Sequence, residues 1–266
     1  MEPTLIIALL SALFVAAHIG MASTRSRAWM VSRVGANWFV ALHLYATVWR
    51  EVHQMRLPNS AHTSRPWRIH ELTRDFRLED VWELPGVGGP DAFPLLVQLI
   101  ASGDPSQSSS VAVRTLFAIR WKIGELLGWD GPDAGLGSRV STLRDRLPAD
   151  LRDAPSGPDF DALPFTSLYL LEDEWAAEIA NRTMHGVMHI GRVSDETGGF
   201  RAQMAVYVKP NGLLGCAYMA VIRPFRHLIV YPPMLREMGR NWRASTARHR
   251  VAGRPDVTLS QASPHD

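Results

Sequence analysis

The sequence predicts an α+β domain, in which an antiparallel sheet wraps a long C-terminal helix, preceded by an N-terminal transmembrane helix. Three observations lead to this class. Residues 3–24 contain no charged side chain. After Pro164 the apolar pattern changes from a helical period to strict alternation, which is typical of strands. The apolar segment 212–243 then returns to a helical pattern. Helices and strands that are segregated along a chain indicate an α+β fold.

The uncharged N-terminal stretch predicts a membrane helix over about 4–23, because roughly 20 apolar residues cross the hydrocarbon core. Three arginines follow this stretch at once, at Arg25, Arg27 and Arg33. Positive charge favours the cytoplasmic side, so we expect a single-pass membrane protein with a cytoplasmic soluble domain. A cleaved signal peptide is the alternative, although the basic residues that usually open one are absent.

A second apolar segment, over about 34–49, is short for a membrane span. It carries Trp38, Tyr45 and Trp49, and such aromatic residues favour the membrane interface. The segment is interpreted either as an interfacial helix or as the second half of a hairpin, and the two interpretations place the soluble domain on opposite sides of the membrane. Residues 1–54 together form the expected membrane anchor.

The stretch "AHIGMASTRSRAWMVSRVGANWFVALH" resembles the start of the NnrU-type integral membrane proteins. The resemblance covers only about the first fifty residues, and the later membrane helices of that family have no counterpart here. Its function is therefore not carried over. We expect that residues 1–54 are a fused membrane fragment, or result from a misassigned start, ahead of a soluble domain over 55–243. The polar segment 244–266 is expected to be a disordered tail.

Within the soluble domain, the early part predicts one or two strands over 66–84 and then two helices. The first helix, in "DAFPLLVQLIAS", has apolar residues at helical spacing. The second, in "VAVRTLFAIRWKIGELLG", is expected to bury one apolar stripe: Leu116, Ile119, Ile123 and Leu127. Residues 130–164 are rich in Gly, Pro and Asp and predict a surface excursion with one short helix around 141–147.

Four strand candidates follow over 165–172, 174–181, 182–193 and 200–209, and their short connections predict an antiparallel meander. In the second strand, Trp175 and Ile179 share a face opposite Glu174 and Glu178, which indicates a sheet with one dry side. The terminal helix is expected to kink at Pro224 and at the Pro232–Pro233 pair.

This order of elements is typical of a helix-grip domain. The segments "SRPWRIHELTRDFRLEDVWELP", "EWAAEIANRTMHGVMHIGRV" and "YVKPNGLLGCAYMAVIRPFRHLIVYPPMLREMGRNWR" together resemble the domain of unknown function 2867 family over about 55–243. That family looks like a branch of the START-like (SRPBCC) superfamily, which implies a START-like domain with a cavity for lipids or other apolar molecules. The resemblance also implies a dehydrogenase-like protein as a partner, and it supplies no catalytic residues.

Composition and motifs exclude several kinds of chemistry. The formal net charge is only +2, so a basic nucleic-acid-binding stripe is not expected, and the single cysteine rules out an intrachain disulfide. "HGVMH" places His185 and His189 on one face of a strand, facing solvent or a covering helix, and no third ligand stands near them in the sequence to complete a metal site. Cys216 is interpreted as a core thiol. We expect no metal and no cofactor.

The sequence supports three hypotheses for function. The first is a membrane-anchored domain that binds a small hydrophobic or amphipathic ligand between the sheet and the C-terminal helix. Its expected wall is Tyr169, Trp175, Ile179, Met188, Met204, Val206 and Tyr218. The second is a cyclase- or hydratase-like enzyme that uses His185 or His189 as a general base. The third is a non-catalytic interaction domain that partners a dehydrogenase-like protein. The absence of catalytic motifs favours binding over catalysis.

Overall fold

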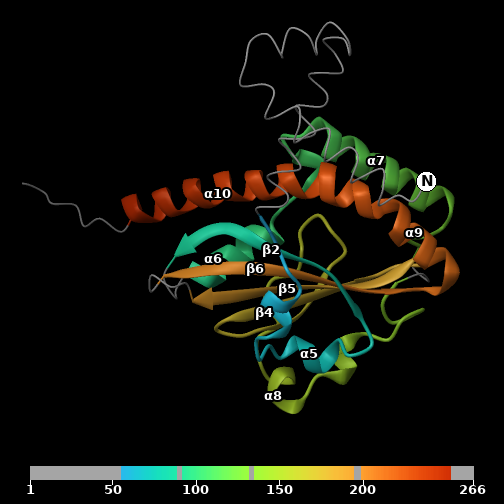
Figure 1. Cartoon of the computed structure of the whole chain (residues 1–266), viewed down its shortest axis with the longest axis horizontal. Helices are drawn as coiled ribbons and strands as arrows, with labels where there is room; N and C mark the ends of the chain where they lie inside the picture. The colour runs from blue at the N-terminus through green and yellow to red at the C-terminus, as the bar shows by residue number, and fades with distance from the viewer. Residues whose placement is uncertain (1–54, 89–91, 132–134, 195–198, 253–266) are drawn as a thin grey trace, which may run out of the picture. The chain divides into compact units, whose positions relative to one another are not determined.

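The computed structural model describes residues 55–88, 92–131, 135–194 and 199–252 (Figure 1). The chain divides into two units, Met1–Met55 and Arg56–Asp266, and all the described residues except Met55 belong to the second. The predicted membrane helix over 4–23, the segment over 34–49 and residues 253–266 of the predicted tail lie outside the described residues.

The second unit is built on one six-stranded sheet in the order β1-β2-β6-β5-β4-β3. Every neighbouring pair is antiparallel. The strands are β1 Arg56–Leu57, β2 Arg77–Gly88, β3 Thr166–Leu170, β4 Glu174–Ala180, β5 Met184–Ser194 and β6 Phe200–Pro210. The predicted meander of four strands is confirmed as β3 to β6, and the α+β class with it. β2 runs past residue 84, where the predicted strand region ends, with a register shift between Leu84 and Val87.

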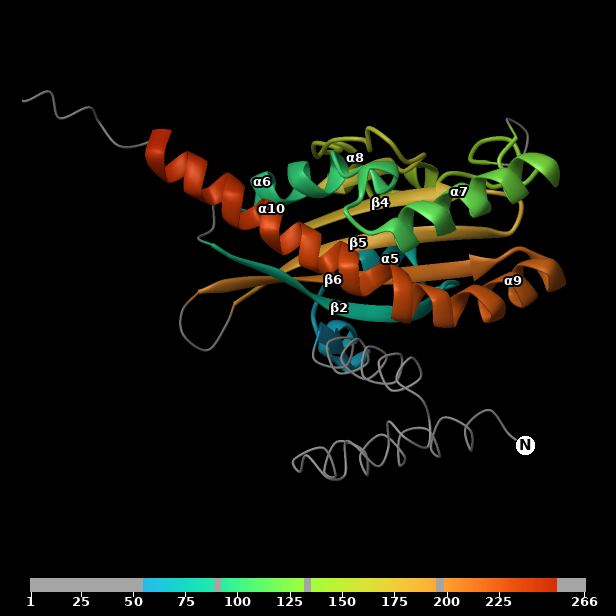
Figure 2. The same ribbon diagram turned by 90° about the horizontal axis from the view of Figure 1, so that it is seen from above.

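Larger helices cover one face of the sheet, here called the helix face (Figures 1 and 2). They are α6 Ala92–Ala101, α7 Val111–Leu126, α9 Gly212–Phe225, the π-helical turn η3 Arg226–Val230, and α10 Tyr231–Ala252. The last three form a continuous rod, which confirms the long C-terminal helix. The rod remains helical to Ala252, so the expectation of unstructured chain over 244–252 is wrong.

A row of four paired side chains forms the centre of the helix face. Trp82 is paired with Met204, Met204 with Ile190, and Ile190 with Trp175, and each is at most 3% exposed. Tyr231 of α10 packs on Trp82 with ring centroids 4.6 Å apart. Burial of this apolar row therefore holds the rod against the sheet.

A buried ion cluster fixes the start of α10. Asp80 of β2 is 1% exposed on its side chain and accepts hydrogen bonds from Arg226 and, at 2.6 Å, from Nε2 of His227. Burial alone would raise the pKa of Asp80, but the His227 hydrogen bond and the charge of Arg226 hold it below its ordinary value. The widened turn η3 carries both partners, so this cluster joins the bend of the rod to the sheet.

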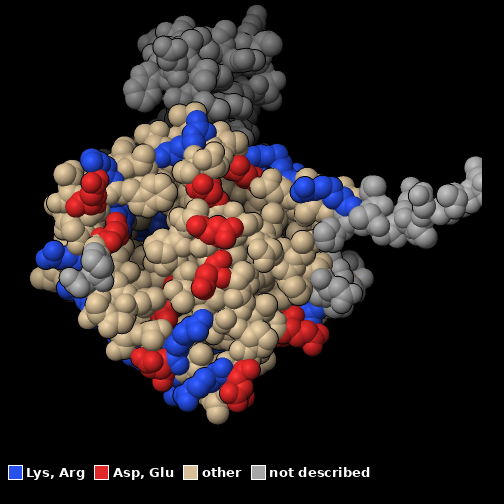
Figure 3. Space-filling view, turned by 180° about the vertical axis from the view of Figure 1, so that it is seen from behind, with Lys and Arg blue, Asp and Glu red and all other residues tan. Residues whose placement is uncertain are grey.

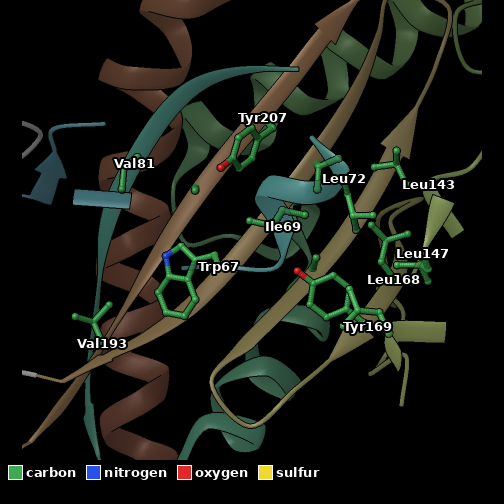
Figure 4. Packing of buried hydrophobic residues seen from close by; sticks show 14 residues of the cluster. Trp67, Ile69, Leu72, Val81, Leu143, Leu147, Leu168, Tyr169, Val193 and Tyr207 are labelled. Carbon is green, nitrogen blue, oxygen red and sulfur yellow. The ribbon is translucent and has the colours of Figure 1, made fainter. Parts of the chain in front are cut away.

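Short elements cover the opposite face, here called the histidine face (Figure 4). They include α4 Ser60–Thr63, α5 Ile69–Leu72, η2 Leu143–Arg146 and α8 Ala149–Arg152. Trp67, Ile69, Leu72, Leu143 and Leu147 from this layer pack with Leu168, Tyr169 and Tyr207 of the sheet. The expectation of one dry side is therefore wrong, because the sheet is buried on both faces. The covering residues come from segments whose apolar positions are too few to show a period.

The helix α7 contradicts the predicted buried stripe. Ile119 is 50% exposed, Ile123 39% and Leu127 52%, whereas only Val113 and Gly124 are buried. The physical reason is the position of α7, which contacts the rod at η3 and covers little of the sheet. Cys216 of α9 is exposed, so its assignment to the core is also wrong.

Candidate functional site

The predicted wall residues divide between the two faces of the sheet. Tyr169 lies on the histidine face, where its hydroxyl donates to Oε2 of Glu174 at 2.9 Å. Trp175 and Met204 lie on the helix face but belong to its fully buried row. Of the predicted wall residues in the sheet, Ile179, Met188 and Val206 are half-buried on the helix face.

These half-buried residues are neighbours, and together with Met184 they are called here the open strip. Met188 is paired directly with Val206 across β5 and β6. Ile179 is paired with Gly186, and a Cβ at Gly186 would lie 3.1 Å from the sulfur of Met184 and 3.3 Å from Cγ2 of Ile179. Because Gly186 has no side chain, Met184 and Ile179 can approach each other above β5. The open strip is therefore one continuous apolar surface on β4, β5 and β6.

A polar group lies at one end of the open strip. Nε of Arg120 in α7 donates to the hydroxyl of Tyr218 in α9 at 2.9 Å, and its guanidinium forms an ion pair with Asp130 at 2.7 Å. The amide of Asn181, next to the end of β4, donates to Asp130 at 3.4 Å. Tyr218 is therefore at the end of the open strip as part of a charged group, and does not form an apolar wall.

The two histidines of "HGVMH" lie on the histidine face, covered by the short elements, and are 3% and 0% exposed. Nε2 of His189 donates to Oε2 of Glu174 at 2.9 Å, and Nε2 of His185 donates to Oε2 of Glu178 at 2.8 Å. The covering layer was one of the two positions expected for them. Because both imidazoles are on the opposite side of the sheet from the open strip, neither can act on a ligand held there.

A further histidine, which sequence reasoning missed, completes this buried group. His62 of α4 is 0% exposed, and its ring centroid lies 4.9 Å from that of His189 and 5.1 Å from that of His70. Neither ring nitrogen of His62 has a hydrogen-bond partner. Burial, then the nearby His189 and His70, lower the pKa of His62 from 6.5 to about 2. His62 is therefore neutral.

The carboxylates of this group are held by backbone as well as by histidine. The amide of Arg68 donates to Oε1 of Glu174 at 2.9 Å, and the amide of Leu143 donates to Oε2 of Glu178 at 3.1 Å. Thr142 also donates its hydroxyl to Glu178. The glutamates thus pin the two covering segments to the sheet. Such contacts explain why Glu174 and Glu178 point inward although the sequence indicates a solvated face.

Two cavities in the described part of the chain lie away from the open strip. One of about 50 Å³ borders Ala61, Arg65 and Gln203 beside the histidine group and is too small for a metabolite. The other, of about 630 Å³, is on the histidine side and is lined by Arg144, Arg152 and Leu168 among others. Both arginines there already donate to backbone carbonyls, of Ser167 and Leu147. Among the described residues no group of three or more His, Cys, Asp or Glu is arranged to hold a metal ion.

The face seen in Figure 3 carries charged side chains of both signs, interspersed over the surface. A basic tract that follows a groove, which would indicate a nucleic-acid interface, is not visible on that face. The electrostatics of this side therefore give no preference for a strongly charged partner.

Comparison with known proteins adds one finding. The family model described as "Protein of unknown function (DUF2867)" matches residues 72–233, more than half of the chain, and the chain belongs to this family. The match includes β2 to β6, the open strip and the rod as far as the start of α10. No curated protein and no solved structure matches the chain. The START-like and NnrU-type resemblances remain predictions.

Proposed function

We propose that this member of the DUF2867 family binds a small amphipathic ligand on the helix face, with its apolar part on the open strip and its polar end near Arg120. The observation that carries the proposal is the contrast in burial along the helix face. The central row is buried, with Tyr231 of α10 packed on Trp82 and Phe160 stacked on Trp175, whereas Ile179, Met188 and Val206 of the same sheet retain accessible surface.

Apolar side chains in the interior of a sheet are normally covered, so their accessibility favours a role in binding. A ligand that removes about 200 Å² of apolar surface from water would gain about 5 kcal/mol at ~25 cal/mol per Å². The methionines suit a range of shapes, because thioether side chains are flexible and polarisable.

The polar end gives the ligand its expected chemistry. Arg120 is half-buried between Tyr218 and Trp129, with its guanidinium 5.5 Å from the centroid of the Trp129 ring. A partly desolvated guanidinium with a hydroxyl beside it favours a carboxylate or phosphate head group, which would have to compete with Asp130 for Arg120. We therefore infer that the ligand is of the fatty-acid type, with one apolar chain and an anionic head group. The protein would then act as a membrane-anchored carrier of this ligand.

Native mass spectrometry of the full chain, released from mild detergent and titrated with palmitic acid or hexadecanol, tests the proposal. We expect one saturable adduct, with the acid bound more tightly than the alcohol. Met188→Gln should weaken binding of both about tenfold, as loss of ~1.4 kcal/mol implies. Arg120→Gln should remove the preference for the acid.

Met238→Gln is the matched control, because Met238 is another half-buried methionine but belongs to α10. If Met188→Gln and Met238→Gln bind palmitic acid equally, the open strip is not the site. If neither probe gives a saturable adduct, a domain that acts by protein interaction, for example with a dehydrogenase-like partner, replaces the proposal. A histidine-based enzyme is not proposed, because His185 and His189 face the other way.

A further inference from the structure

The large apolar side chains with the greatest exposure in the described residues all come from α7, its adjoining Leu127, and α9. The most accessible are Leu213 at 90%, Leu126 at 73%, and Val111 and Val221 at 66% each. Six residues define what is here called the apolar face: Ile119, Ile123 and Leu126 on α7, and Leu213, Val221 and Phe225 on α9. Soluble surfaces rarely gather such side chains in one place.

The two helices form a single surface. Arg120 of α7 bonds to Tyr218 of α9, and the ring of Tyr218 packs edge-on against Trp129 at 5.4 Å just beyond the end of α7. Figures 1 and 2 both show α7 and α9 near one another at the same end of the sheet, on its helix side. The inner side of α9 packs closely against the turn before β5. At Gly215 the approach is so close that a Cβ would collide with the carbonyl oxygen of Thr183.

We infer that the apolar face docks this domain onto the surface of an anionic phospholipid bilayer, with α7 and α9 lying in the interface. The inference is independent of the ligand proposed above. It rests on the exposure of the apolar face and on the charges that border it.

The charges favour anionic lipid. From Gly212 to Val230 the rod has no acidic residue and carries the exposed Arg223, whereas Arg226 and His227 are bound to Asp80 and do not count toward this surface charge. α7 carries Arg114 and Lys122 against a single acidic residue, Glu125, and the charge of its Arg120 is balanced by Asp130. Helices with an apolar side and flanking Lys or Arg bind membrane interfaces through buried area and attraction to anionic head groups. A second copy fits less well, because a symmetric contact would place this basic set against itself.

The rod also fits a position on the membrane better than a passage across it. The helix Gly212–Arg248 is long and apolar enough to span a bilayer by length and composition. However, Tyr231, Leu235 and Trp242 of α10 are at most 7% exposed within the domain, and spanning would remove them from it. A rod that is held by the sheet on one side and apolar on the other is suited to interfacial binding.

The single cysteine offers a direct test, because Cys216 is exposed on α9. The full chain, labelled there with the fluorophore NBD, is incorporated into vesicles of phosphatidylcholine with phosphatidylserine. The positional control is Cys216→Ser with Glu172→Cys, which moves the label to an acidic residue whose side chain is 87% exposed. We expect nitroxide groups near the lipid head groups to quench the Cys216 label at least threefold more strongly than the control label.

Three changes should reduce that difference. Leu213→Ser with Val221→Ser should abolish it, and both residues are exposed, so folding is not at risk. Lys122→Glu with Arg223→Glu should reduce it, as should vesicles of phosphatidylcholine alone. Equal quenching of both labels by aqueous iodide would overturn the inference. So would strongest quenching from the bilayer centre, which indicates a span, or rapid Cys216–Cys216 cross-linking with no lipid quenching, which indicates a second copy.

Discussion

Buried His62 should make the fold sensitive to mild acid. Its folded pKa is about 2, against an ordinary value of 6.5, so below pH 6.5 the unfolded chain takes up a proton that the folded chain refuses. Stability is therefore complete above about pH 7 and falls as the pH is lowered. Each pH unit below 6.5 costs about 1.36 kcal/mol, so at pH 5 this histidine alone removes about 2 kcal/mol.

The neighbour His189 acts in the same direction. Burial lowers its pKa, although its hydrogen bond to Glu174 opposes part of the effect. We therefore expect the full chain in mild detergent to lose at least about 2 kcal/mol of unfolding free energy between pH 7 and pH 5, measured by urea titration of tryptophan fluorescence. The loss should begin well above the pH at which carboxylates titrate.

The variant His62→Phe separates this cause from the others. Phenylalanine keeps an aromatic ring in contact with Trp67 and His189, and it removes two buried nitrogens that have no partner. We expect it to be about 1 kcal/mol more stable than the wild type at pH 7. Its loss of stability on going to pH 5 should be about 2 kcal/mol smaller. An unchanged pH dependence in this variant would refute the reasoning, because it would mean that the pKa of His62 is the same in the folded and unfolded states.

Two other predictions concern the rod. Asp80→Asn leaves the buried Arg226 without its counter-charge. We expect this variant to lower the unfolding free energy by about 3–5 kcal/mol in the same urea titration. A loss below about 1 kcal/mol would show that the ion pair is solvated. In the wild type, the depressed pKa of Asp80 adds stability above about pH 4, and this is lost as the pH falls through the folded pKa. Gly215→Ala should push α9 away from Thr183 and lower the unfolding free energy by about 1–3 kcal/mol, with faster amide hydrogen exchange confined to α9. The control is Ala217→Gly at an exposed position of the same helix, which should leave the contacts of α9 with the sheet unchanged.

The sequence was sufficient to predict the elements with a clear period. Alternation in β4 to β6 predicted both the strands and the side on which Trp175, Met188 and Met204 lie, because each residue in a strand points opposite to its neighbour. The long helical pattern after Asn211 predicted the rod. Alternation does not reveal how well other elements cover a face of the sheet. The sequence therefore could not show which of the predicted wall residues belong to the fully buried central row and which belong to the half-buried open strip.

The errors have a common physical origin in long-range contacts. A bulge between Ser167 and Tyr169 shifts the register of β3 against β4 and directs Tyr169 toward Glu174. Glu174 and Glu178 satisfy a strand pattern with one polar side, but backbone amides of Arg68 and Leu143 bury them. His62 gave no signal in sequence, since a lone histidine in a polar stretch has no period. The unusual apolar content of α7 was visible, yet the pattern does not state whether such a helix faces a core or a membrane.

The two faces of the sheet differ in a way that bears on function. On the histidine face, buried carboxylates each satisfy several donors, an arrangement that fixes position and tolerates little movement. On the helix face, the Asp80 cluster fixes only the bend of the rod, and α7 and α9 are joined to each other mainly through Arg120 and Tyr218. Because the open strip ends beside that same contact, a head group that binds Arg120 would compete with Asp130 and Tyr218 and change how α7 meets α9. Ligand entry and membrane contact would then depend on one pair of helices, while the opposite face keeps the sheet rigid.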